Sequence, residues 1–138
     1  KFLIDLYETD DLNTIINFLN TINNDSEINS NYKTRETIEV LNSFLKIEKT
    51  QISKYDYTVI SDDRVMPSYF LINDIRQNMT GQNNLTLFLL SLISMNNKNW
   101  HELHPEHLNL ILQAFNLYDQ GSLIKPIILE ILGDLNII

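Results

Sequence analysis

Apolar residues recur at helical spacing in two segments of the first half of the chain. In residues 10–23 they fall on one face and asparagines fall on the opposite face, as in a half-exposed helix. In residues 35–49 they form two stripes, which predicts contacts on two sides, and Thr34 is the expected N-cap. The pattern therefore predicts one helix in each segment, followed by a loop over residues 50–66.

In the second half of the chain, proline, glycine and asparagine mark the expected starts and ends of a pair of helices. Pro67 suits the first position of a helix, where its missing N–H is not needed. Gly81 suits the residue that ends this helix. Asn83 or Asn84 is the expected N-cap of the next helix, which covers residues 85–95.

The helix predicted over residues 85–95 is apolar around almost its whole circumference. Only Ser91 and Ser94 leave a narrow polar strip. A helix that is apolar on all sides is usually buried by neighbours on all sides. We therefore expect this helix to lie at the centre of the fold, with four side chains buried: Leu87, Phe88, Leu90 and Ile93.

A second pair of helices follows the same plan. Pro105 opens a helix that runs to about Tyr118, and Gly121 is the turn residue that closes it. Ser122 is the expected cap of the last helix. That helix carries isoleucines at helical spacing and ends near Leu135, so we expect one of its faces to be buried.

The two helical pairs repeat at a nearly constant interval. Pro67 and Pro105 are 38 residues apart, and Gly81 and Gly121 are 40 apart. Units of this size include the tetratricopeptide and HEAT repeats, which stack because one unit cannot bury its apolar face alone. The predicted fold class is all-α, with stacked antiparallel helical hairpins that form an α-solenoid. A compact helical bundle is the alternative.

The length of 138 residues suits a single all-helical domain. Residues 1–60 form its less regular half, and residues 61–138 hold the two helical-hairpin repeats. The first residue is Lys1 and not Met, so we expect the chain to be a fragment of a longer protein. The longest apolar run is too short to cross a bilayer, so no membrane span is predicted.

The stretch from Val65 to Glu130 resembles the C-terminal helical region of a group of poorly characterised alphaproteobacterial, rickettsia-like solenoid proteins. The similarity lies in a proline-led helix, the apolar run from Leu85 to Ile93, and the motif His104-Pro105-Glu106-His107-Leu108. The family has glycines after the apolar helix, whereas this chain has Asn96 and Asn97. The resemblance implies a helical solenoid fold, and it implies no activity and no catalytic residue.

Composition and charge narrow the classes of function. The chain has no Cys, so it has neither disulfides nor a thiolate metal site. Its formal net charge of -8 disfavours a phosphate-backbone binder. Its cations are concentrated in residues 33–54, but acidic residues are interleaved with them, so no basic stripe forms. We predict no nucleic-acid partner.

All three histidines lie in one short segment, as His101, His104 and His107. Their spacing raises the hypothesis of a metal site, but zinc needs three or four ligands that converge on one point. The simpler interpretation places His104 at a helix start and the other two histidines in solvent. We predict no metal and no cofactor.

The sequence contains no recognisable arrangement for catalysis. Carboxylates are paired at Asp10–Asp11 and Asp62–Asp63, and on so acidic a chain such pairs are usually solvated. Neither a nucleophile elbow nor a glycine-rich phosphate loop is present. We predict that the chain is not an enzyme.

The C-terminal helices carry more apolar surface than they can cover. The helix over residues 105–118 has two apolar stripes, and the chain ends in two isoleucines. We therefore predict a non-catalytic protein–protein interaction module. The alternatives are a structural or self-association domain and an anti-apoptotic-like bundle that binds a partner helix. The expected partner-binding residues are Leu110, Leu117, Tyr118, Ile137 and Ile138.

Overall fold

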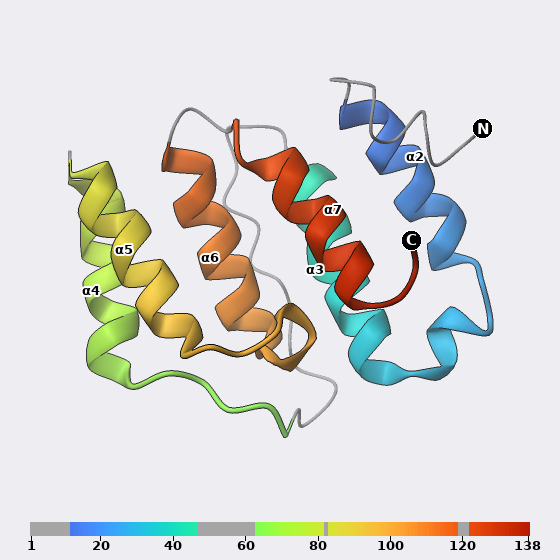
Figure 1. Cartoon of the computed structure of the whole chain (residues 1–138), viewed down its shortest axis with the longest axis horizontal. Coiled ribbons are helices and arrows are strands. Elements are labelled where there is room, and N and C mark those ends of the chain that lie inside the picture. The colour runs from blue at the N-terminus through green and yellow to red at the C-terminus, as the bar shows by residue number, and fades with distance from the viewer. Residues whose placement is uncertain (1–11, 47–62, 82, 119–121) are drawn as a thin grey trace.

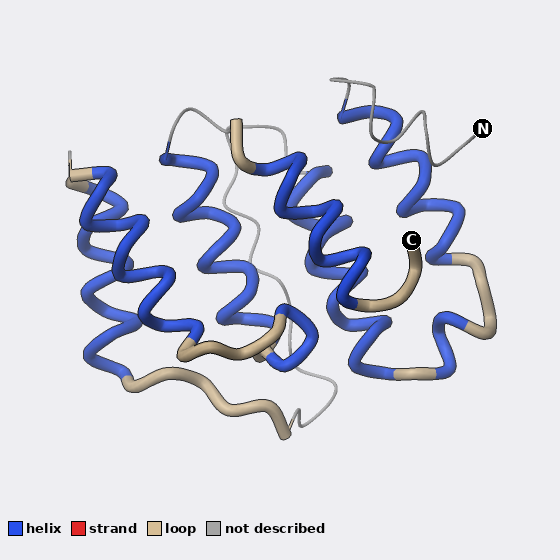
Figure 2. The backbone as a smooth tube through the Cα atoms, viewed as in Figure 1, coloured by secondary structure: helices blue, strands red, loops and turns tan. Residues whose placement is uncertain are grey.

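The computed structural model describes residues 12–46, 63–81, 83–118 and 122–138, and these contain helices and loops without a strand (Figure 2). The prediction of an all-α fold is confirmed. The α-helices are α2 (Leu12–Asn23), α3 (Tyr32–Lys46), α4 (Tyr69–Thr80), α5 (Asn84–Met95), α6 (Pro105–Leu117) and α7 (Ile124–Asp134). Two 3-10 helices, η1 (Ile28–Ser30) and η2 (Trp100–Glu102), lie in the connections.

Helix α6 lies in the middle of the molecule, with α5 on one side and α3 on the other (Figure 1). Helix α4 pairs with α5 at one end, and α2 pairs with α3 at the other. Helix α7 contacts α6 and η2. The C-terminal helices therefore lie between the other two pairs, although they come last in the sequence.

Two apolar clusters hold these helices together. The larger one joins α2, α3, η2, α6 and α7, and the smaller one joins α4, α5 and α6. Burial of this apolar surface is the main favourable contribution to folding. The fully buried members of the larger cluster include Ile15, Leu19, Ile38, Leu41, Leu108, Ile111, Leu112, Ile128 and Ile131, and the smaller cluster consists of Ile72, Ile75, Leu87, Leu110 and Ala114.

Two of the predicted helix starts are confirmed. Asn83 is the N-cap of α5, and its side chain accepts a hydrogen bond of 3.1 Å from the Thr86 N–H. Pro105 is the first residue of α6, where its lack of an N–H leaves no donor unsatisfied. His104 caps this helix, because its Nδ1 accepts a bond of 3.2 Å from the Glu106 N–H.

Three predicted starts are wrong by one to three residues. Helix α3 begins before Thr34, because the Asn31 side chain accepts bonds from two of its first N–H groups. Helix α4 begins after Pro67, because Ser68 is the N-cap and accepts a bond from the Leu71 N–H. Ser122 precedes the N-cap of α7, which is Leu123.

The two turn glycines predicted to end helices are only partly described. Gly81 follows α4 with φ -87° and ψ 179°, so it is extended and not left-handed. Its position confirms the predicted helix end, but its backbone does not require glycine. Gly121 and most of the predicted loop over residues 50–66 lie outside the described residues.

The prediction that α5 is the central helix is wrong. Leu87 is fully buried and Phe88 and Leu90 are partly buried, but Ile93 is 65% exposed. The serines of the predicted polar strip are instead buried, at 0% and 5% exposure. Their small side chains allow close packing of α5 against its neighbours, and the hydroxyl of Ser94 meets a buried partner on α6. The aliphatic residues are left to face outward.

Candidate functional site: an apolar groove between α5 and α7

A pocket of about 580 Å³ lies between α5 and α7, with residues of α6 and η2 at its base. This volume is in the range typical of pockets for small molecules and cofactors. We call it the α5–α7 groove. Its lining is mainly apolar and aromatic, with three charged residues, and consists of Phe88, Leu92, Met95, Lys98, Asn99, Trp100, Phe115, Leu123, Ile127, Glu130 and Asp134.

Aromatic packing fixes the α5 wall of the groove. The Phe88 ring stacks on the Tyr118 ring with centroids 4.5 Å apart, and it packs at a tilt on the Phe115 ring at 5.3 Å. Such pairs add about 0.5–1.5 kcal/mol beyond their burial. The predicted site residue Tyr118 therefore lies next to the groove, where it supports a lining residue.

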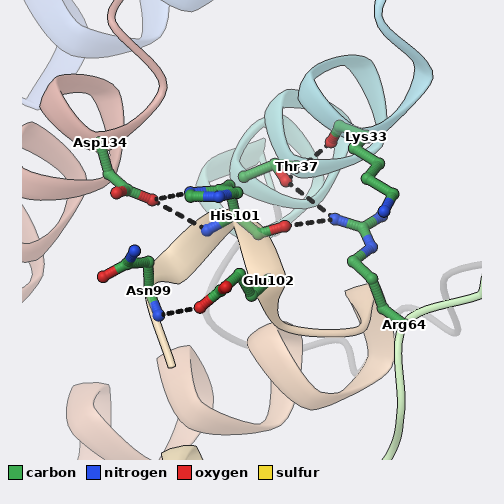
Figure 3. A network of polar contacts seen from close by, with 7 residues as sticks. All are labelled: Lys33, Thr37, Arg64, Asn99, His101, Glu102 and Asp134. Atoms are coloured by element: carbon green, nitrogen blue, oxygen red, sulfur yellow. Dashed lines mark hydrogen bonds and ion pairs between the residues drawn. The ribbon is translucent and has the colours of Figure 1, made fainter. Parts of the chain in front are cut away.

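Trp100 forms part of the groove's base and is 8% exposed. It lies in η2, a short helix that polar contacts hold in place (Figure 3). The Asn99 N–H donates to the Glu102 carboxylate at 2.7 Å. The Asp134 carboxylate accepts from both the backbone N–H and the ring Nδ1 of His101, at 3.0 and 2.6 Å. These bonds tie η2 to the end of α7 and so position the base of the groove relative to its α7 wall.

Arg64 strengthens the same region from the opposite side (Figure 3). It is only 7% exposed, and its Nη1 donates to the His101 carbonyl at 3.2 Å and to the Thr37 hydroxyl at 3.5 Å. One side chain thus links the segment before α4 to both α3 and η2. No local sequence pattern indicates this role of Arg64, because its acceptors lie 27 and 37 residues away along the chain.

The three predicted metal-ligand candidates point to different partners. His101 binds Asp134, His104 caps α6, and His107 Nε2 lies 2.8 Å from the Ser94 hydroxyl. Among the described residues, no group of three potential metal-ligating side chains comes together. The expectation that His107 faces solvent is wrong, because it is 1% exposed. The His101 side chain is 41% exposed, although it also binds Asp134.

His107 is buried at the contact between α5 and α6. Burial lowers its pKa to about 4, and the positive charges of Lys98 and His104 act in the same direction. The Ser94 hydroxyl donates to the Ser91 carbonyl at 2.6 Å. Its oxygen is therefore the acceptor for His107, whose neutral ring donates from Nε2. The pair therefore links the two helices through a buried side-chain hydrogen bond.

A second apolar surface lies on the outer side of α5. Leu85, Leu89, Leu92 and Ile93 are 58%, 48%, 44% and 65% exposed, and they recur at i, i+4, i+7 and i+8. We call these four residues the outer stripe. Helix α5 contains no charged residue to solvate it. Because Leu92 also lines the groove, the stripe and the groove share one edge.

The predicted partner-binding residues do not form one surface. Leu110 is 6% exposed and belongs to the smaller apolar cluster, so it is not accessible to a partner. Ile137 and Ile138 are partly buried against the larger cluster, because the chain turns back after α7. Only Leu117, at 45%, is among the strongly exposed apolar residues. Among the described residues, the strongly exposed apolar side chains lie mainly on α5 and at the start of α4, where Tyr69 and Phe70 are 73% and 79% exposed.

The carboxylates named as candidates lie mostly outside the described residues. This holds for Asp10, Asp11 and Asp62. Asp63 accepts a hydrogen bond from the Tyr32 hydroxyl at 2.9 Å and pairs with Lys33 at 3.3 Å. The Tyr32 bond and the Lys33 charge lower the pKa of this exposed carboxyl, so it is a surface ion-pair member.

Comparisons with protein-family models, curated proteins and solved structures gave no match to this chain. The resemblance to the alphaproteobacterial solenoid proteins therefore stays a prediction. None of the helices in the described part of the chain is long and apolar enough to cross a membrane.

Proposed function

We propose that this chain is a non-catalytic protein-interaction module that holds an apolar helical segment of a partner protein in the α5–α7 groove. The observation that carries the proposal is a groove of about 580 Å³ with aromatic residues in its base and aliphatic residues on its walls. Amphipathic helices bind such grooves through anchors at helical spacing. Aromatic residues at the centre of an interface also contribute strongly to affinity.

The compact bundle is the arrangement that we propose in place of a stacked solenoid. Helix α6 packs against both α3 and α5, whereas consecutive stacking would leave the last pair at one end. The two prolines of the repeat also have different roles, since Pro105 is the first helical residue and Pro67 precedes the N-cap. This arrangement supports the helix-binding bundle among the alternatives from the sequence.

The single tryptophan of the chain provides a direct test, because Trp100 lies in the base of the groove. The probe is a designed amphipathic helical peptide with one leucine face, a neutral glutamine and serine face, and no aromatic residue. Titration of this peptide should change the Trp100 emission in a saturable manner. A peptide of the same composition with a scrambled order should leave the emission unchanged.

Two variants in the same helix separate the groove from the outer stripe. Leu92→Glu places a charge on the groove wall and should weaken peptide binding by about tenfold or more. Leu85→Glu places the same charge on an exposed residue that does not line the groove, and it should leave the affinity within about twofold. Equal effects of the two variants, or no binding of the peptide to the natural chain, would contradict the proposal.

Self-association through the outer stripe is a second candidate function. It is favoured by four exposed aliphatic residues on a helix without charge, and exposed apolar patches commonly mark interaction sites. Sedimentation at low and high protein concentration tests it. If the stripe forms a dimer, the mass should rise with concentration for the natural chain and stay monomeric for Leu89→Lys. A natural chain that is monomeric throughout would contradict this candidate.

A further inference from the structure

The rim of the α5–α7 groove carries one charge of each sign. Lys98 follows the end of α5, and Glu130 lies on α7, so the cation and the anion come from different sides of the apolar base. In the part of the chain that the structure describes, neither makes an ion pair. The third charged lining residue, Asp134, is already occupied by His101 at 2.6 Å. Lys98 and Glu130 are therefore the charges left for a ligand.

We propose that the partner helix carries an acidic residue along one edge of its apolar face and a basic residue along the other edge. This inference rests on the proposed function. The apolar face would lie on Trp100 and Phe115, the acidic edge would meet Lys98, and the basic edge would meet Glu130. Charges at the rim of an interface select the partner and its orientation more than they add affinity.

The direction of the helix is coupled to this charge pattern. When a helix is reversed in a groove with its apolar face still down, its left and right edges exchange places. A helix with one acidic and one basic edge therefore matches the rim in only one of the two directions. If the two rim charges are exchanged, the same helix matches in the opposite direction.

The probes are peptides that share one leucine face and differ only at their edges. One has an acidic and a basic edge, and one has neutral glutamine edges. Anisotropy of a labelled peptide gives the affinity at low ionic strength, where rim charges are least screened. The affinity of the neutral peptide depends on the apolar groove alone. If the neutral peptide does not bind, the proposed function is contradicted and not only the inference about the charges.

Each charge reversal in the groove has a matched control on α4. Lys98→Glu and Arg76→Glu change the net charge equally, as do Glu130→Lys and Asp74→Lys. Arg76 and Asp74 are exposed and do not line the groove. Comparison within each pair cancels the general effect of net charge on a chain of formal charge -8.

Each single charge reversal in the groove should lower the affinity for the peptide with one acidic and one basic edge by about two- to fivefold relative to its α4 control. This is the range expected for exposed ion pairs. The double variant Lys98→Glu/Glu130→Lys should bind this peptide about as well as the natural chain does, because the reversed helix restores both pairs. The neutral peptide should respond to none of these variants. The inference would be overturned if the single reversals matched their α4 controls, or if the double variant were as weak as the sum of its single changes.

Discussion

Helices α5 and α6 lie side by side and are both rich in aliphatic residues, yet only α6 is buried by the fold. Helix α6 has Leu108, Ile111 and Leu112 at 0% exposure, whereas α5 has only Leu87 buried among its aliphatic residues. The difference arises from the polar positions. In α5 the side that packs against the protein includes the two serines, so most of its aliphatic side chains face outward. In α6 the aliphatic side chains themselves pack against the neighbouring helices. Apolar content alone therefore does not identify the central helix.

The largest expected effect comes from shortening a central side chain of α6. Leu112→Ala should lower the free energy of unfolding by about 2–5 kcal/mol, since it removes buried methyl groups and leaves a cavity. Leu89→Ala on α5 is the matched change, and it should lower the free energy of unfolding by less than about 1 kcal/mol, because Leu89 is 48% exposed. Urea unfolding of both variants measures the two values. Equal losses would contradict the difference between the two helices.

The contact between α5 and α6 should make stability depend on pH. The pKa of His107 is lowered to about 4 by burial, below the unfolded value of 6.5. As the pH falls below 6.5 the unfolded state gains a proton that the native state does not bind, so stability decreases until the native state is protonated near pH 4. The loss from this group is at most about 3 kcal/mol. Above pH 7 the histidine contributes no pH dependence.

Replacement of His107 isolates this contribution from that of the carboxylates. Unfolding of the natural chain and of His107→Asn is measured between pH 7 and pH 5. The natural chain should lose stability more steeply than the variant as the pH falls. Parallel curves would show that His107 is not held neutral at this contact.

Substitutions of Ser91 test, at a single position, whether the polar side of α5 faces the protein and its aliphatic side faces solvent. It is fully buried, and its hydroxyl donates to the Leu87 carbonyl within the same helix at 2.8 Å. Ser91→Leu should destabilise the fold by about 1–3 kcal/mol, because an extra side chain must fit into a packed contact. Ser91→Ala should change stability by about 0.5 kcal/mol or less, since no bond to another helix is lost. A neutral Ser91→Leu variant would place this side chain in solvent.

The sequence predicted the helical class and the approximate bounds of the described helices, because periodic apolar positions and caps are local signals. It predicted the N-cap Asn83 and the helix start at Pro105 for the same reason. It misplaced α5, because the side of a helix that faces the core depends on which neighbours it contacts. It did not predict the groove, since Phe88, Trp100 and Ile127 are brought together only by the packing of three segments. Arg64 was missed because its acceptors are distant in sequence.

The central claim is that α5 presents aliphatic side chains to solvent, where a partner can cover them. Ile93→Lys tests it most directly, because Ile93 is 65% exposed here and was expected to be buried from the sequence. The measurement is the free energy of unfolding at low protein concentration, where self-association does not contribute. We predict a change within about 0.5 kcal/mol, as for other exposed positions. A loss of about 3 kcal/mol or more, as expected for a lysine forced into a core, would contradict the account.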